Sequence, residues 1–214
     1  ITIRKLIPKQ RETKISYRST SILNEEAKAI LQQASTVFIA SKHIDNVYTN
    51  QSDMGFNHRG GNPGFVRYYE SNDTNSNNLI GRLVLPDYSG NMFYQSLGNI
   101  QVDSSIGIVV LDFHTGNSLH ITGQAVNLYN EEASEIMPKS TLITVINISE
   151  AMVLQGSIQF DLINTESYSP YNPPIALLSS EMKEKGINLI STTNIPTAKL
   201  SNIVKNTAKI STFT

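Results

Sequence analysis

Two stretches of the sequence carry residue types that are able to hold a phosphate or another anion. The first, Asn57–Phe65, places Arg59 beside Gly60, Gly61 and Gly64. Successive backbone N–H groups in a glycine-rich turn form a concave donor surface for an anion, and a guanidinium adds a bidentate donor. The alternative interpretation is a tight turn or bulge in which the glycines serve only the backbone and the arginine faces solvent.

The second stretch, Pro86–Asn91, leads into a predicted short helix. Ser89 is placed to cap that helix, and a helix N-terminus presents unpaired N–H groups with a partial positive charge. The Ser89 hydroxyl and the Asn91 amide would share a phosphate there, with Gly90 allowing a close approach. The alternative is an ordinary serine N-cap without a ligand.

Other chemistries find less support in the sequence. The four histidines show no HExxH-type spacing and no paired carboxylates, so we expect no metal site. The chain contains no cysteine, which excludes disulfide scaffolds, cysteine-ligated zinc, iron–sulfur clusters and cysteine nucleophiles. There is no G-x-S-x-G elbow, no P-loop and no G-x-G-x-x-G sequence, so neither hydrolysis nor nucleotide binding of those kinds is indicated.

The composition describes a globular protein. The chain has 214 residues, of which 39% are hydrophobic and 16% are charged, and its net charge is −1. A charge so close to zero weighs against nucleic acid as a partner. No apolar run approaches the ~20 residues that span a bilayer, so we expect no membrane partner. The absence of cysteine fits a reducing compartment, and we expect a cytoplasmic location.

The patterns that must position these stretches begin with a helix. Asn24–Ala34 has an N-cap residue, acidic residues in its first turn and one apolar face, which together predict a helix. Between the two candidate stretches we expect a hairpin whose polar loop is Ser71–Asn78. The strands predicted in this half of the chain are Thr36–Ala40, Val47–Gln51, Phe65–Tyr69 and Gly81–Leu85. The apolar face predicted for the short helix holds Phe93, Leu97 and Ile100, with Gly98 as its end.

Further strands follow that helix. Ile106–Phe113 is apolar throughout, as a central strand is, and Leu119–Ala125 alternates as a half-buried strand does. At Val126 the apolar phase flips, which predicts a bulge. Two more strand-like segments are Leu142–Ile148 and Ala151–Phe160. Short connections between such segments favour a mainly β (α+β) fold, an antiparallel barrel with a few short helices.

The two ends of the chain differ from this pattern. Residues 1–20 are rich in Lys and Arg and predict a solvated arm or linker, with a partner-binding arm as the alternative. The barrel is expected over residues 21–165. The proline-rich Ser169–Pro174 interrupts the pattern, Leu177–Lys185 predicts a short helix, and residues 166–214 form a C-terminal extension.

Three sequence blocks resemble the pyridoxamine 5′-phosphate oxidase-like family. They are NHRGGNPGFVR (Asn57–Arg67), LPDYSGNMFYQSLGNI (Leu85–Ile100) and GIVVLDFHTGNSLHITGQA (Gly107–Ala125), in that order. More narrowly, they are similar to a branch of the family with the pattern HRGG-PGF followed by PDY-GN. The resemblance covers roughly residues 35–128.

The resemblance implies an antiparallel split β-barrel that forms a homodimer and binds FMN at the dimer interface. It implies a flavin-dependent oxidoreductase of unknown substrate, with an unidentified set of catalytic residues. Tyr88 would lie near the isoalloxazine or ribityl chain, and Ser118 and Gln124 would line the ring. The cofactor-binding residues that it implies are His58, Arg59, Gly60, Gly61, Tyr88, Ser89, Asn91, Ser118 and Gln124.

The chain also departs from that family. Pyridoxamine phosphate oxidases place Arg and Lys after the serine at the helix start, where this chain has Gly90 and Asn91, and no Arg follows Arg82 to hold a substrate phosphate. Pyridoxamine phosphate oxidase activity is therefore not supported. The alternative is a non-catalytic binding module of the same fold that has lost or changed its cofactor: a scaffold, a ligand sensor or a haem binder. Asn202–Thr214 looks similar to the first strand of a ferredoxin-reductase-like module, which implies a fused or separate reductase partner.

Overall fold

The structure is a computed structural model that describes residues 6–44, 53–72, 78–90, 94–162, 168–187, 203–205 and 211–213. The chain forms two compact units, residues 1–180 and 181–214, each of which is treated by itself. The predicted strand Val47–Gln51 and most of the predicted loop Ser71–Asn78 lie outside the described residues.

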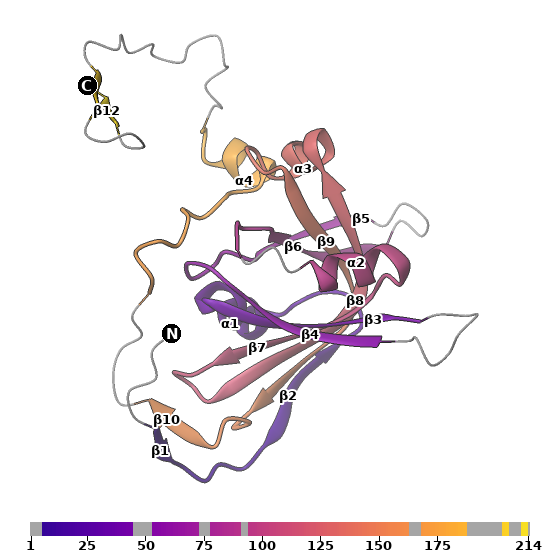
Figure 1. Cartoon of the computed structure of the whole chain (residues 1–214). Helices are drawn as coiled ribbons and strands as arrows, with labels where there is room; N and C mark the ends of the chain where they lie inside the picture. The colour runs from indigo at the N-terminus through magenta and orange to yellow at the C-terminus, as the bar shows by residue number, and fades with distance from the viewer. Residues whose placement is uncertain are drawn as a thin grey trace. The chain divides into compact units, whose positions relative to one another are not determined.

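Antiparallel strands dominate the first unit, as the sequence predicted, with few and short helices (Figure 1). Its strands are β1 (Leu6–Pro8), β2 (Lys14–Ser19), β3 (Thr36–His43), β4 (Asp53–Gly60), β5 (Arg67–Asn72), β6 (Leu79–Pro86), β7 (Ser105–Asp112), β8 (Asn117–Tyr129), β9 (Leu142–Gln155) and β10 (Phe160–Leu162). Its helices are α1 (Glu25–Gln33), α2 (Gln95–Val102) and α3 (Asn130–Ile136), and α4 (Ser179–Glu184) crosses into the second unit.

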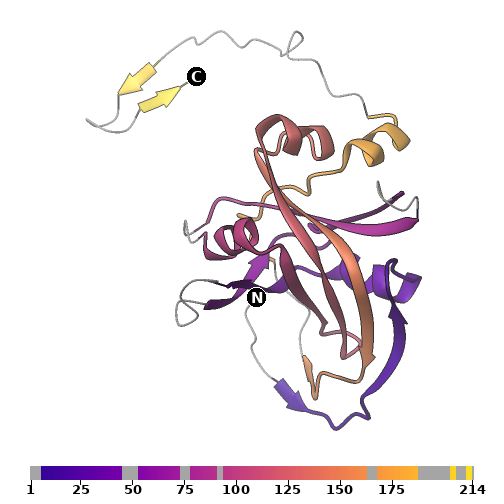
Figure 2. The same ribbon diagram turned by 90° about the vertical axis from the view of Figure 1, so that its right-hand side faces the viewer.

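The main sheet runs in the order β4-β3-β7-β8-β9-β6-β5, and β2 also pairs with β9. The long strand β9 has β8 along one edge and divides its other edge between two strands. Residues 143–147 pair with β6, whereas residues 151–155 pair with β2. The sheet therefore opens into two halves along β9, which is the split of a split β-barrel (Figure 1 and Figure 2).

Helix α1 packs its apolar face into the main hydrophobic core. Asn24 caps it by accepting a 2.9 Å hydrogen bond from the Ala27 N–H, and Ala27, Ile30 and Leu31 are buried in the main core. The alternation predicted for β8 is also confirmed, because Leu119, Ile121 and Ala125 join the same core. Between them, Gly123 has the backbone of β9 so close that no side chain fits there.

A second, smaller core lies on the outer side of β6 and β9. Val84, Ile143 and Val145 from the strands pack there with Ala133 of α3 and with Met137. None of the helices in the described part of the chain is long and apolar enough to span a membrane.

Two local predictions about the strands differ from the structure. Residues Lys14–Ser19 of the predicted solvated arm are a strand, β2, whose backbone hydrogen bonds are met by β9. The bulge lies between Thr122 and Gly123, not at Val126. The alternation of exposed and buried side chains continues past Val126, which is half-exposed, to Asn127, which is buried. Asn127 is buried because it donates to the Leu97 carbonyl at 2.9 Å and accepts from Thr144 at 2.9 Å.

The predicted helix start at Ser89 is wrong. Helix α2 begins at Gln95, and its N-cap position, Tyr94, makes no side-chain capping bond. Gly98 lies inside the helix, donating its N–H to the Tyr94 carbonyl at 2.8 Å, and so does not end it. In the second unit, β11 (Ile203–Lys205) and β12 (Ser211–Phe213) pair as an antiparallel hairpin.

Candidate functional site

The first candidate stretch begins as strand and only then turns. Asn57, His58, Arg59 and Gly60 belong to β4, which pairs with β3 over its whole length. The turn follows at residues 61–64, where Gly64 has φ +82°. A side chain at Gly61 would lie 2.6 Å from the Phe65 ring, so glycine there lets Phe65 pack into the core.

Strand β4 is the terminal strand of the main sheet, and one of its edges pairs with no strand in the described part of the chain, so we call that edge open. The Gly61 N–H donates to the Ser35 carbonyl at 3.0 Å, which makes this a hydrogen-bonded pair of the antiparallel ladder. Hydrogen-bonded and non-hydrogen-bonded pairs alternate, so Arg59 and Asn57 turn their backbone groups toward β3. Phe56, His58 and Gly60 therefore turn their N–H and C=O groups toward the open edge.

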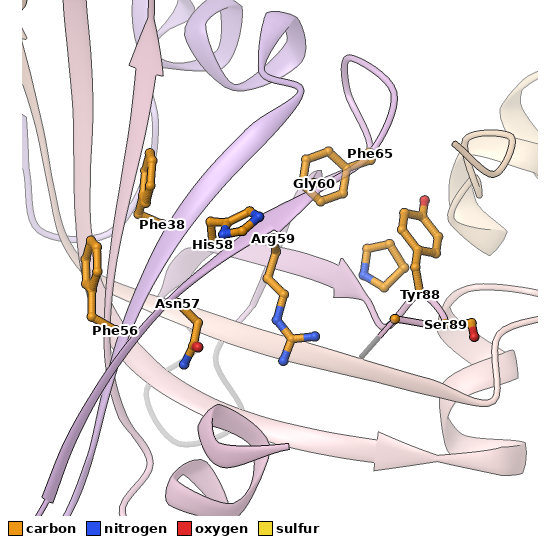
Figure 3. A pocket seen from close by; sticks show the side chains of 11 residues that line it. Phe38, Phe56, Asn57, His58, Arg59, Gly60, Phe65, Tyr88 and Ser89 are labelled. Carbon is orange, nitrogen blue, oxygen red and sulfur yellow. The ribbon is translucent and has the colours of Figure 1, made fainter. Parts of the chain in front are cut away.

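A pocket of about 500 Å³ lies along this edge, and we call it the main pocket. It brings together the two stretches predicted from the sequence: Phe56–Gly60 of β4 on one side, and Pro86 with residues 88–90 on the other. In Figure 3, Phe38 and Phe56 stand at one end, and Tyr88 and Ser89 stand at the other. The two candidate stretches thus line one pocket.

His58 and Arg59 enter this pocket from opposite sides of β4 (Figure 3). Successive side chains of a strand alternate between its faces, so His58 lies on the outer face with Phe38, and Arg59 lies on the inner face with the buried Val37. The Arg59 Nη1 atom is 2.8 Å from the Asp87 carboxylate, and the two side chains are 22% and 18% exposed. The charge of Arg59 therefore has a partner within the protein.

Tyr88 contributes its ring to the pocket wall and packs at a 6.3 Å centroid distance from Phe65. Its hydroxyl is buried, with no hydrogen-bond partner among the described residues. Burial raises the pKa of this phenol, since ionisation would place a charge away from water. Tyr88 is thus a neutral aromatic wall near neutral pH.

An aromatic platform, which the sequence patterns did not predict, forms the other end of the pocket. The rings of Phe38 and Phe56 stack at 5.7 Å with an interplanar angle of 7°, and Phe56 is 66% exposed. Phe56 and His58 are two residues apart and would share one face of a strand. The glycines and polar residues around them do not favour a strand, so the sequence did not predict this pattern. Asp87 was also missed as the partner of Arg59.

The remaining predicted residues lie elsewhere. Ser118 is 1% exposed in β8, where its hydroxyl bonds with His120 and Ser157 at 2.8 Å each. Gln124 accepts a hydrogen bond from Ser104. Neither lines the main pocket, Gly61 lines a neighbouring one, and Asn91 lies outside the described residues. In the described part of the chain no three His, Asp or Glu side chains gather as metal ligands would.

Comparison with protein-family models gives no match, and comparison with curated proteins gives none either. Similar solved structures include HupZ of Group A Streptococcus, with 13% identity over 59% of this chain and 90% of that chain, TM-score 0.38. The FAD binding protein from Mycobacterium smegmatis has 12% identity over 63% and 97%, TM-score 0.35. A protein of the pyridoxinephosphate oxidase family from Clostridium acetobutylicum has 9% identity over 64% and 92%, TM-score 0.35.

Proposed function

We propose that the main pocket binds flavin mononucleotide and that the protein is a flavin-dependent oxidoreductase of unknown substrate. The observation that carries this proposal is the convergence of β4 and the segment after β6 on one pocket. That pocket offers a flat aromatic platform at one end, and a guanidinium, a hydroxyl and open-edge N–H groups near the other. This set of donors fits a ligand with both a planar ring and an anionic group.

The residues have distinct proposed roles. Phe38 and Phe56 would support the ring, while the Ser89 hydroxyl and the N–H groups remaining on Arg59 would hold the phosphate. When bound, the flavin supplies the redox chemistry, and the protein supplies its orientation and electrostatic surroundings. A reduced nicotinamide or a partner reductase domain is the electron donor that we propose.

The decisive experiment is a titration of the purified chain with FMN. We expect saturable binding with a flavin absorption shift and a rise in melting temperature, because a ligand that binds only the folded state stabilises it. Arg59→Ala should weaken binding at least tenfold. Arg18→Ala is the matched control, since Arg18 pairs with Glu150 on an exposed surface away from the pocket. A colourless protein that shows neither effect would refute flavin binding.

The ion pair between Arg59 and Asp87 favours a second candidate, a non-catalytic module of the same fold. Arg59 is the one Lys or Arg among the described residues that line the main pocket, and Asp87 already offsets its charge. A scaffold, ligand sensor or haem binder needs no strong phosphate site. Flavin binding without reduction by NADH or NADPH, or a haem spectrum after haem addition, would favour this candidate.

We also propose a homodimer in which a second copy covers the exposed apolar residues of β4. Met54 and Phe56 are 75% and 66% exposed on this terminal strand. Exposed apolar side chains beside an open strand edge commonly mark an interaction surface. Light scattering should give twice the mass of one chain. For the double variant Met54→Lys with Phe56→Lys, it should give the mass of a single chain.

A further inference from the structure

A second hollow, of about 480 Å³, adjoins the main pocket, and we call it the side pocket. Phe38, His58 and Gly60 line both pockets, so the two pockets adjoin at these residues. The volume of the side pocket falls in the range of pockets that bind small molecules, about 300–1,000 Å³. A molecule in the side pocket would therefore lie next to whatever occupies the main pocket.

The far wall of the side pocket is built by a distant part of the chain. The segment 168–172 returns to the end of β4 and contributes Tyr168, Ser169 and Asn172 to the pocket wall. Asn62 fixes this segment, since its side-chain amide donates to the Pro173 carbonyl at 3.0 Å and its oxygen accepts from Asn172 at 3.4 Å. These contacts cross more than a hundred residues of sequence, so the wall is a tertiary feature and not a local turn.

The chemistry of the walls indicates the class of ligand. Three aromatic rings line the pocket, from Phe38, Phe113 and Tyr168, together with the apolar Leu111. The other lining groups are neutral hydroxyls, an amide and His58, and no Lys, Arg, Asp or Glu lines it among the described residues. An ion would lose part of its hydration there without a partner of opposite charge, whereas a planar aromatic molecule would gain ring contacts.

We propose that the side pocket binds an uncharged planar aromatic molecule. Its placement beside a flavin, as the second reactant, rests on the function proposed above. Its preference for a neutral aromatic ligand rests on its own walls.

The test uses 2-naphthol, which is uncharged at pH 7, and 2-naphthoate, which has the same rings and a negative charge. Calorimetric titrations of the full chain with each compound should show saturable binding of one 2-naphthol, with 2-naphthoate at least roughly tenfold weaker. Equal binding of both compounds, or no saturable binding of 2-naphthol, would overturn the proposal.

Variants locate the binding. Leu111 and Ser169 line the side pocket and not the main one, so Leu111→Trp and Ser169→Trp should each weaken 2-naphthol binding at least roughly tenfold by filling it. Ile15→Trp, at an exposed position of β2, is the bulky control and should change nothing. Ser169 is exposed, so its variant keeps the test valid if Leu111→Trp misfolds.

The same titrations separate this inference from flavin binding. Arg59→Ala should leave 2-naphthol binding unchanged, because Arg59 lines only the main pocket of the two. If FMN fails to bind but 2-naphthol binds and Ser169→Trp abolishes it, the flavin proposal fails and the side pocket stands. If FMN binds and 2-naphthol binding is unaffected by both tryptophan variants, the side-pocket proposal fails alone.

Discussion

Arg59 and Asp87 join the two halves of the candidate site, with Nη1 of the arginine 2.8 Å from the aspartate oxygen. One residue lies in the terminal strand β4 and the other directly after β6, so the pair links the two segments that line the pocket. The same pair also sets the charge of the pocket, because the carboxylate offsets the guanidinium next to the place proposed for a phosphate.

Asp87→Asn should therefore strengthen the binding of an anion. Asparagine keeps an acceptor oxygen for Arg59 but removes the negative charge. This should make the binding free energy of an anion more favourable by about 1 kcal/mol, which lowers its dissociation constant roughly fivefold. We expect FMN to bind more tightly, and more so at low salt, while riboflavin, which has no phosphate, binds as before. Fluorescence titration of both flavins measures this.

The matched control is Glu150→Gln, which breaks the exposed pair with Arg18 in the same chemical way. It should change neither dissociation constant. Equal strengthening of FMN and riboflavin by Asp87→Asn would contradict the charge argument.

Tyr88→Phe should stabilise the protein. It removes a buried hydroxyl that has no partner among the described residues, at a gain of about 1 kcal/mol in the free energy of unfolding. The melting temperature should rise by roughly 2–4 °C.

Tyr68→Phe is the contrasting change, because the Tyr68 hydroxyl accepts from the Leu23 N–H at 3.1 Å and donates to Glu70 at 2.9 Å. It should lower the free energy of unfolding by about 1 kcal/mol. Differential scanning calorimetry compares the two, and equal shifts would show that the Tyr88 hydroxyl is satisfied.

Two glycines should respond to alanine in opposite directions. At Gly123 an added Cβ would lie 2.2 Å from the Asn147 carbonyl oxygen of β9, so alanine must displace backbone and should destabilise strongly. At Gly98, inside α2, nothing lies within 4 Å of the added Cβ, and alanine should stabilise by about 0.5–1 kcal/mol. Urea denaturation of both variants checks the signs.

His120 should make stability depend on pH. Burial lowers its pKa below the usual 6.5, because the charged imidazolium is disfavoured away from water. As the pH falls below 6.5 the unfolded chain binds a proton that the folded chain resists, so stability is lost from that pH downward. His120→Gln should flatten this fall in the free energy of unfolding between neutral and mildly acidic pH, which urea denaturation at a series of pH values measures.

The parts of the fold that depend on neighbouring residues could be predicted from the sequence. The N-cap and apolar spacing of α1, the hairpin between β5 and β6, and the alternation of β8 are each set by neighbouring residues, and each is present. The family resemblance also placed residues of the two candidate stretches around one cofactor, and both stretches line the main pocket.

What escaped prediction depends on distant partners. Strand β4 contains Asn57, His58 and Gly60, which favour turns locally, and it is a strand because β3 satisfies its backbone. Ser89 is a good N-cap residue in isolation, yet the helix begins only at Gln95. The side pocket depends on Asn62 holding a segment more than a hundred residues away, which no local pattern reveals.

The pairing of β2 with β9 bears on how the chain matures during its synthesis. Lys14–Ser19 are synthesised before the residues with which they pair, 151–155. No nascent fragment that stops short of those residues can finish the sheet, however long the ribosome pauses. Strand β2 must therefore stay unaggregated until residues 151–155 have been synthesised. The Lys and Arg residues at positions 1–20 oppose such premature self-association.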